Sequence, residues 1–242
     1  MTNKQRATSG FTLVELAIVL VIVGLLISGI LKGMEIIHNG QMQRTVHQYE
    51  SYLAAHHSFE DIYNRMPGDM ADATGKIPGC TAANNCANGD GNSILGARLN
   101  NGAGTTGGLE NTLYWKHLAL ADLITGIDVS ASTGAGDIRF GISHPVTPLG
   151  GGWNAIMTDL NGIGDYGGIG VILQISGRPN GNRQVLTPEE AEYIDRQLDD
   201  GRPNSGSVTA EWSSSTNCDD DASNSYVLQT ISDDCLMYFR VR

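Results

Sequence analysis

An uncharged apolar run at residues 16–31 is the feature that most constrains this chain. Residues 11–31 form a segment of 21 residues, close to the roughly 20 that a membrane-spanning helix needs. Lys4 and Arg6 precede the run, and basic residues on this side favour a cytoplasmic N-terminus with export of the rest of the chain. We therefore expect one membrane-spanning helix at residues 11–31.

The segment differs from an ordinary secretory signal in two respects. The small residue expected at a cleavage site, Gly10, precedes the apolar run, whereas a secretory signal places it afterwards. Glu15 adds a carboxylate at the start of the run, where an unpaired charge at mid-depth costs roughly 2.5–3.5 kcal/mol. A free amino terminus created at Phe11, in this chain or a neighbouring one, would supply the missing partner.

The segment Gly10-Phe11-Thr12-Leu13-Val14-Glu15 resembles the processing site of the type IV pilin family, whose prepilins carry a class III signal. That family includes major pilins, minor pilins and the pseudopilins of type II secretion. The resemblance implies that residues 1–10 are a leader, that a prepilin peptidase cuts after Gly10, and that the Phe11 amino group is methylated. It also implies that Glu15 aligns the subunit during assembly and that the apolar helices pack as a filament core. Lys32 stands where many pilins carry a proline.

The alternative is a signal-anchored protein with a single membrane helix, in which Glu15 is an interfacial carboxylate without a special task. An ionisable residue inside a membrane segment is by default a functional hypothesis. The coincidence of leader, Gly10, Phe11 and Glu15 at fixed spacing favours the pilin-like interpretation.

The composition excludes several classes of function. The chain of 242 residues has a net charge of −11, and strong acidity argues against a nucleic-acid partner, because phosphate backbones bind Lys and Arg. The 31 glycines predict a loop-rich domain. The sequence has no nucleophile elbow, P-loop or HExxH motif, so we expect that the protein is not an enzyme.

The periodicity predicts an α+β fold of the pilin type. Apolar residues continue at helical spacing to the stop signal Met66-Pro67-Gly68-Asp69, so we expect one helix over residues 11–64, about 81 Å at ~1.5 Å per residue. Residues 65–242 then form a head domain with an antiparallel sheet and long loops, against which the helix packs. Within the head we expect an amphipathic helix at residues 110–124 and a second helix that begins at the capping box of Thr187. Strands are expected at residues 138–142, 153–157, 169–175, 226–231 and 235–241. The last two strands are expected to form a hairpin.

Four cysteines fall into two local pairs, and the exported side of the membrane is oxidising. Four cysteines allow three pairings, and the local one is favoured. A zinc site is the competing interpretation and fits poorly, because neither pair has a flanking histidine. The expected disulfides are Cys80–Cys86 and Cys218–Cys235, the second closing the C-terminal region as in the disulfide-bounded region of type IV pilins.

Calcium is the one cofactor that the sequence leaves open. Asp159, Asn161 and Asp165 alternate oxygen ligands with glycines, as loops that bind hard cations do. Similar spacing recurs at residues 88–92 and 195–200, but none of these segments is an EF-hand, and ordinary turns use the same residues. The alternative is therefore that no cofactor binds.

The predicted function is that of a structural subunit of a type IV pilus or related filament, assembled through its N-terminal helix. The expected partners are copies of the same chain or other pilins, the prepilin peptidase and the inner membrane. The precursor would span the inner membrane once, and the mature chain would enter an extracellular filament or a periplasmic pseudopilus. A type II pseudopilin, or a minor pilin whose head binds a surface, remains the alternative, and the length of the chain favours these over a main pilin.

Overall fold

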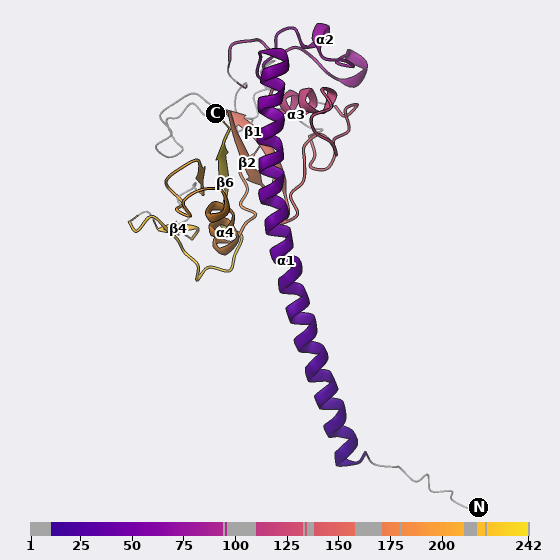
Figure 1. The fold of residues 1–242 in the computed structure, drawn as a ribbon, viewed down its shortest axis with the longest axis vertical. Coiled ribbons are helices and arrows are strands. Elements are labelled where there is room, and N and C mark those ends of the chain that lie inside the picture. The colour runs from indigo at the N-terminus through magenta and orange to yellow at the C-terminus, as the bar shows by residue number, and fades with distance from the viewer. Residues whose placement is uncertain are drawn as a thin grey trace, which may run out of the picture. The chain divides into compact units, whose positions relative to one another are not determined.

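The computed structural model describes residues 11–93, 95, 110–132, 134, 138–157, 171–179, 181–210, 217–220 and 222–241. The chain divides into two units, Met1–Gln41 and Met42–Arg242. The helix α1, Leu13–Tyr63, contributes to both (Figure 1). Its expected range was residues 11–64, so the sequence placed both of its ends within two residues.

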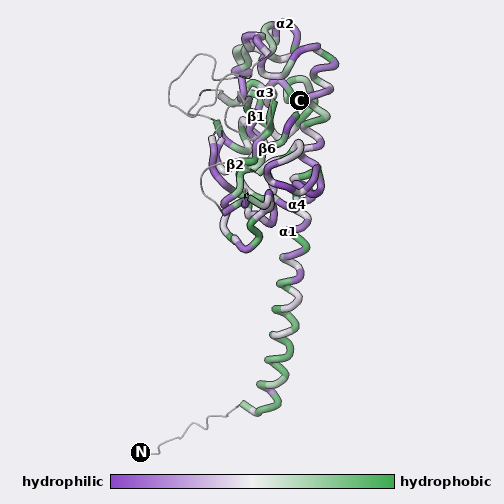
Figure 2. The backbone as a smooth tube through the Cα atoms, turned by 90° about the vertical axis from the view of Figure 1, so that its left-hand side faces the viewer, coloured by the Kyte–Doolittle hydropathy of each residue, from purple (hydrophilic) through white to green (hydrophobic). Residues whose placement is uncertain are grey.

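The first unit consists of the N-terminal part of α1. Figure 2 shows that hydrophobic residues follow one another along this part of the helix. Among the residues that the structure describes, this is the stretch long and apolar enough to cross a membrane. Leucine, isoleucine and valine side chains on all its faces are exposed, because the described residues of this unit include no further element that covers them.

The second unit, the head, begins with the rest of α1, which has a buried face. Its buried residues recur at spacings of three and four, and a helix of 3.6 residues per turn places such residues on one side. Tyr49 packs on Phe239 with ring centroids 4.9 Å apart, and Tyr52 packs edge-on to Trp115 at 5.1 Å. The buried residues of α1 are Met42, Thr45, Val46, Tyr49, Tyr52, Ala55, His56 and Phe59.

A four-stranded antiparallel sheet forms the other side of this core. Its order is β1 (Gly152–Met157), β2 (Val171–Ser176), β6 (Met237–Arg240) and β3 (Val208–Thr209). All six residues of β2 are buried, as expected of a strand between two neighbours with both faces covered. A second sheet pairs β4 (Asp219–Asp220) with β5 (Ser225–Tyr226). The architecture is α+β, which confirms the predicted fold class.

Short helices complete the head: α2 (Ala73–Lys76), a 3₁₀ turn η1 (Ala82–Asn84), α3 (Glu110–Leu120) and α4 (Pro188–Leu198). The predicted capping box is present at α4: the Thr187 hydroxyl accepts from the Glu190 N–H, and the Glu190 carboxylate accepts from the Thr187 N–H at 2.8 Å. These reciprocal bonds satisfy donors that the helix itself cannot.

The helix α3 differs from the expected amphipathic helix over residues 110–124. All of residues 110–118 are buried, including the polar Lys116 and His117, because loops of the head cover the face that would otherwise meet water. The helix also ends earlier, at Leu120. Asp122 adopts a positive φ of 58°, and the Leu123 N–H returns to the Leu118 carbonyl at 3.0 Å, which closes the helix as a Schellman turn does.

Three predictions about strands were wrong: the strand at residues 138–142, the strand at residues 226–231, of which only Tyr226 lies in β5, and the C-terminal hairpin. Residues 138–142 form a turn, in which the Arg139 carbonyl accepts from the N–H groups of Ser143 and His144 at 3.0 and 3.2 Å. The expected C-terminal hairpin is absent from the described residues, because β6 pairs with β2 and β3 inside the main sheet, while β5 pairs with β4. Pairing in the centre of the sheet buries the apolar residues of β6 on both faces, which a two-stranded hairpin cannot do.

Candidate processing and assembly site

The start of α1 is a capping box built on Thr12 and Glu15. The Thr12 N–H and the Thr12 hydroxyl each donate to Glu15 Oε2 at 2.9 Å, and the Glu15 N–H donates to the Thr12 hydroxyl at 3.2 Å. These bonds satisfy N–H groups that the first turn of a helix leaves unpaired, and the carboxylate also lies favourably at the positive end of the helix dipole. Glu15 therefore has a local structural role.

Sequence reasoning missed this role, although the signal was available. A threonine followed three residues later by glutamate, directly before an apolar run, is the sequence signature of a capping box. Both hydrogen bonds from Thr12 end on Oε2, so Oε1 accepts none from the described part of the chain. The geometry leaves Oε1 able to accept from a further donor. Of the predicted processing residues, Gly10 lies outside the described residues, and Phe11 precedes the cap with 82% of its surface exposed.

The helix continues from this cap with an unusually large exposed apolar surface for a protein in water. Side chains from Leu13 to Ile37 are between about two fifths and nine tenths exposed, with Leu13 at 86% and Val23 at 43%. A contiguous apolar surface of this kind marks a site of contact with other proteins or with a membrane. Lipid or neighbouring apolar helices are the surroundings that this part of α1 can tolerate.

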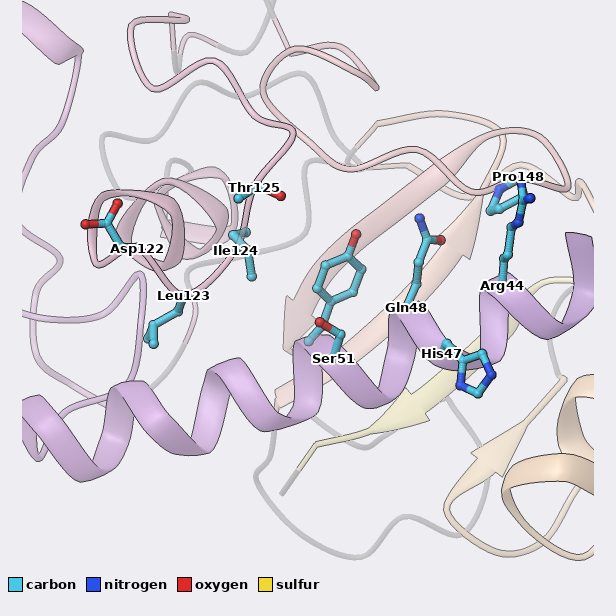
Figure 3. Close-up of a pocket in the computed structure, with 10 residues that line it drawn as sticks. Arg44, His47, Gln48, Ser51, Asp122, Leu123, Ile124, Thr125 and Pro148 are labelled. Atoms are coloured by element: carbon cyan, nitrogen blue, oxygen red, sulfur yellow. The ribbon is translucent and has the colours of Figure 1, made fainter.

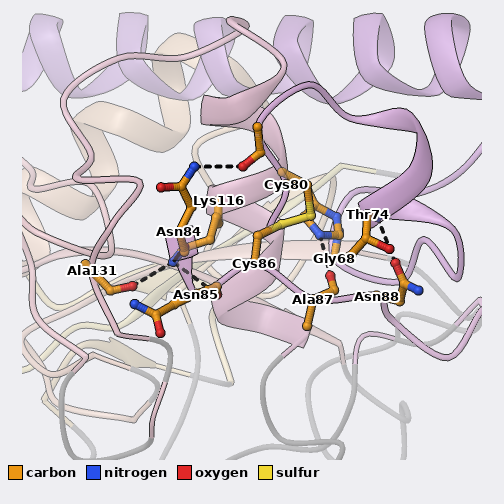
Figure 4. Close-up of a disulfide and its surroundings, with 12 residues drawn as sticks. Gly68, Thr74, Cys80, Asn84, Asn85, Cys86, Ala87, Asn88, Lys116 and Ala131 are labelled. Carbon is orange, nitrogen blue, oxygen red and sulfur yellow. Dashed lines mark hydrogen bonds between the residues drawn. A yellow bond between two sulfur atoms is a disulfide. The ribbon is translucent and has the colours of Figure 1, made fainter. Parts of the chain in front are cut away.

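The head carries the two disulfides in the local pairing, Cys80–Cys86 and Cys218–Cys235. The first has both cysteines buried and closes a hydrogen-bonded loop next to Lys116 of α3 (Figure 4). The second joins the chain just before β4 to the chain just before β6, and it does not close a hairpin as the sequence suggested. The four cysteines are paired in two disulfides, so in this structure none of them is a thiolate that could bind zinc.

Lys116 and His117 hold the loop of the first disulfide from two sides. The Lys116 ammonium donates to the carbonyls of Asn84, Asn85 and Ala131 at 2.7, 3.2 and 2.6 Å, and burial lowers its pKa to about 8. Burial likewise lowers the pKa of His117 to about 4. His117 is therefore neutral at pH 7, and each of its two ring nitrogens forms a hydrogen bond.

The two nitrogens of His117 join segments far apart in the chain. Nδ1 accepts from the Gly68 N–H at 3.0 Å, so Nε2 carries the proton and donates to the Ala87 carbonyl at 3.1 Å. This bond set links the stop signal of α1 to the chain beyond Cys86. No spacing rule could have found it, because the partners lie 49 and 30 residues away.

Three carboxylates meet beside this loop. Ligand atoms of Asp69, Asp90 and Glu110 lie within 4.8 Å of one another. Asp69 accepts from the N–H groups of Asn92 and Ser93 at 3.0 Å each, and Glu110 accepts from the Asp90 N–H at 2.8 Å. Burial raises the pKa of Asp69, and the two N–H bonds oppose that shift. These contacts explain the carboxylates as acceptors that hold the loop of residues 88–92 against the chain after α1, at Asp69, and against the start of α3, at Glu110.

A second acidic cluster surrounds Asp195 in α4. The Tyr226 hydroxyl donates to Asp195 Oδ2 at 2.7 Å, and the Gly201 N–H donates to Oδ1 at 3.2 Å. Burial raises the pKa of Asp195 to about 7, and the neighbouring carboxylates of Asp199 and Asp200 act in the same direction. The carboxyl group thus joins α4 to β5, and its protonation changes near neutral pH.

The residues predicted to bind calcium, Asp159, Asn161 and Asp165, lie outside the described residues. Calcium binding at that loop therefore stays a prediction. Binding of one Ca²⁺ per chain in a calorimetric titration, lost in a variant with Asp159→Asn and Asp165→Asn, is the result that the prediction requires.

Comparison with protein families gives one match. Residues 5–31 match the model described as a prokaryotic N-terminal methylation motif. The whole chain gave no significant match to curated proteins or to solved structures. The chain thus carries a class III signal of the kind found in type IV pilin-like prepilins, at the place where Gly10, Phe11 and Glu15 predicted one.

Proposed function

We propose that this protein is a structural subunit of a type IV pilus or related filament. One observation carries the proposal: a methylation motif at residues 5–31 continues into a capped helix whose apolar side chains are exposed on all sides. A processing signal of this kind is consistent with a subunit that is cut, methylated and assembled. An apolar surface of this size also needs other helices or lipid around it.

In this proposal the Phe11 amino group and the Glu15 carboxylate act together. Prepilin peptidase would cut after Gly10 and leave a cationic amino terminus on Phe11. Glu15 Oε2 remains with Thr12, and Oε1 accepts from the amino terminus of an adjacent subunit. The pair neutralises two charges that lipid would otherwise disfavour, and it fixes the axial position at which one helix meets the next.

The proposed location of the protein changes when the leader is cut off. The precursor spans the inner membrane through residues 11–31, with copies of itself, other pilins and the peptidase as partners. The mature chain then enters an extracellular filament or a periplasmic pseudopilus. A minor pilin or a pseudopilin is the second candidate, favoured by the mature length: removal of ten of the 242 residues leaves 232.

The test compares Glu15→Ala with Glu35→Ala in the full chain. Glu35 is a matched control, since it is another carboxylate of α1, exposed and paired with Lys32 at 2.7 Å. Removing one partner of a desolvated ion pair costs roughly 3–5 kcal/mol. We therefore expect Glu15→Ala to insert normally into the inner membrane and to lower the yield of sheared filaments by more than about tenfold, with Glu35→Ala unchanged. Equal filament yields from the wild type and Glu15→Ala would refute the proposed role of Glu15.

A further inference from the structure

A groove of about 510 Å³ runs along α1 within the head. One wall is α1 at residues 44–52, and the other is the chain at residues 122–125, directly after α3 (Figure 3). Pro148 closes one end. The Gln48 side chain, which lines the groove, is fixed by donating to the Val146 carbonyl at 3.1 Å and accepting from Trp153 Nε1 at 3.1 Å. At Gln48, the wall formed by α1 is therefore held in place.

The two ends of the groove differ in charge. Arg44 and His47 lie at the end near Pro148, and Asp122 lies at the other end (Figure 3). Arg44 is exposed and forms no ion pair with the residues that the structure describes, whereas His47 contacts Glu50 at 3.0 Å. Leu123 supplies partly exposed apolar surface between the two ends, and Tyr52 and Ile124, which are nearly buried, line the groove there as well. A ligand with a carboxylate beside an apolar group fits this order of side chains.

The same chain presents such a ligand on a different part of the head. The loop at residues 227–234, which we name the acidic loop, exposes 93% of Ile231 and 51% of Leu228. Asp233 and Asp234 come next in the chain, with Asp233 exposed. The loop has internal order, because the Thr230 N–H donates to the Val227 carbonyl at 3.0 Å. An almost fully exposed isoleucine beside two carboxylates gains from a partner that covers it.

We propose that the acidic loop of one copy docks into the groove of the next copy in the filament, with Ile231 against the apolar surface and the carboxylates near Arg44. This inference rests on the proposed function. Charge supports a second copy as the occupant: without Lys4 and Arg6 the net charge of −11 becomes −13 on each processed chain, so two copies repel unless a basic group meets an acidic one. The Arg44 end of the groove and the acidic loop form such a pair.

The placement of the two surfaces suits a filament. The loop extends from β5, which contacts α4, whereas the groove lies between α1 and the chain after α3. Figure 1 shows α4 and α3 on opposite sides of α1 in the head. Contact between two different surfaces is heterologous and leaves a free groove on one copy and a free loop on the other. Such a contact can repeat along a filament.

The first experiment places a photoreactive benzoylphenylalanine at position 231 of the full chain, expressed in cells that assemble the filament. A control probe at position 22 reports contacts of the apolar helix. We expect the position-231 probe to join two copies, with the crosslinked peptide falling in residues 44–52 or 122–125. Arg44→Glu should lower that yield by about tenfold, because it sets like charges against each other. It should leave the position-22 crosslink unchanged.

A charge exchange separates a direct contact from a folding defect. Arg44→Glu combined with Asp233→Lys and Asp234→Lys should restore the position-231 crosslink, a recovery that damaged heads would not show. Crosslinks between copies from position 22 alone would overturn the docking proposal and leave the filament proposal standing. Crosslinking of position 231 to another protein or to lipid would also overturn it. If neither probe joins two copies, both proposals fail.

Discussion

At the scale of single residues, Glu15 has a role in folding that is compatible with the assembly role proposed for it. Its bonds to Thr12 order the first turn of α1 within one chain, so the carboxylate would already be positioned for the amino terminus of a second subunit. Positioning in advance lowers the entropy cost of forming the ion pair. The same motif begins α4 at Thr187 within the head, so a capping box by itself does not indicate an assembly site.

Asp195 gives a prediction for the pH dependence of stability. Its pKa is about 7 in the folded head and about 3.9 in an unfolded chain, so between these values the native state binds more protons at this site. The free energy of unfolding from this group is therefore highest below about pH 4 and falls as the pH rises towards 7. We expect Asp195→Asn, which can still accept from Tyr226, to remove this decline.

The measurement is a series of thermal melts of the full chain in detergent between pH 4.5 and 7.5. Other carboxylates titrate in both proteins, so the quantity of interest is the Tm of the wild type minus that of Asp195→Asn at each pH. That difference should fall steadily with rising pH. Two parallel curves would show that Asp195 does not titrate in this range in the folded head.

At the scale of elements, the two disulfides stabilise segments with different amounts of other support. The loop closed by Cys80–Cys86 is also held by Lys116 and His117, through bonds to the backbone at residues 84, 85 and 87. The segment closed by Cys218–Cys235 contains the two short strands β4 and β5 and the acidic loop. Its further anchors among the described residues include the bond of Tyr226 to Asp195 and the bonds of Asn204 to Asn224 and Asp219, all of which end on side chains of the segment.

We therefore expect different local effects when each bond is removed. The bonded cysteines are 6 and 17 residues apart in the chain. Removing either disulfide should lower the free energy of unfolding by about 2–3 kcal/mol, slightly more for the longer loop. Hydrogen exchange should show that Cys80→Ser with Cys86→Ser keeps protected amides near residue 86. The pair Cys218→Ser with Cys235→Ser should lose protection at residues 225–227. Equal loss at both places would contradict the anchoring role of Lys116 and His117.

The elements that the sequence predicted well are those set by local signals. The proline-glycine stop ends α1, and the Thr187 box with Pro188 begins α4, because helix ends depend on bonds within one turn. The strand at residues 138–142 and the C-terminal hairpin failed for the opposite reason. Their apolar alternation was real, but partner choice in a sheet depends on residues far away, such as the pairing of Phe239 with Leu173.

In the candidate site too, features set by neighbouring residues were predictable and features set by distant residues were not. The processing segment was predictable because leader, cleavage residue and carboxylate are adjacent in the chain, and the methylation motif matches there. The buried polar residues of α3 were not predictable, since Lys116 is satisfied by carbonyls 15 to 32 residues away. An amphipathic helix was expected here, and its polar side is buried only because loops distant in the chain pack over it.

At the scale of the whole molecule, the chain combines two units with opposite solvent requirements. The part of α1 in Met1–Gln41 exposes apolar side chains, while Met42–Arg242 has its own aromatic core and an acidic composition that favours water. Removal of Lys4 and Arg6 with the leader would change the net charge from −11 to −13, and both lost charges are basic. Processing would thus remove the cations that hold the N-terminus on the cytoplasmic side.

This change leads to a prediction about the mature chain. Mass spectrometry of sheared surface filaments and of washed inner membranes from the native cell should find a chain that begins with N-methylated Phe11. Abundant methylated Phe11 in the filaments would identify a main pilin, and the same terminus confined to membranes or traces outside would identify a pseudopilin or minor pilin. A Gly10→Leu variant is the control, since a bulky residue at the cleavage position should keep the leader on and hold the chain in the membrane. If the wild type retains Met1 in both fractions, the class III signal is not used, and the leading mechanism fails because Glu15 then has no amino terminus to pair with.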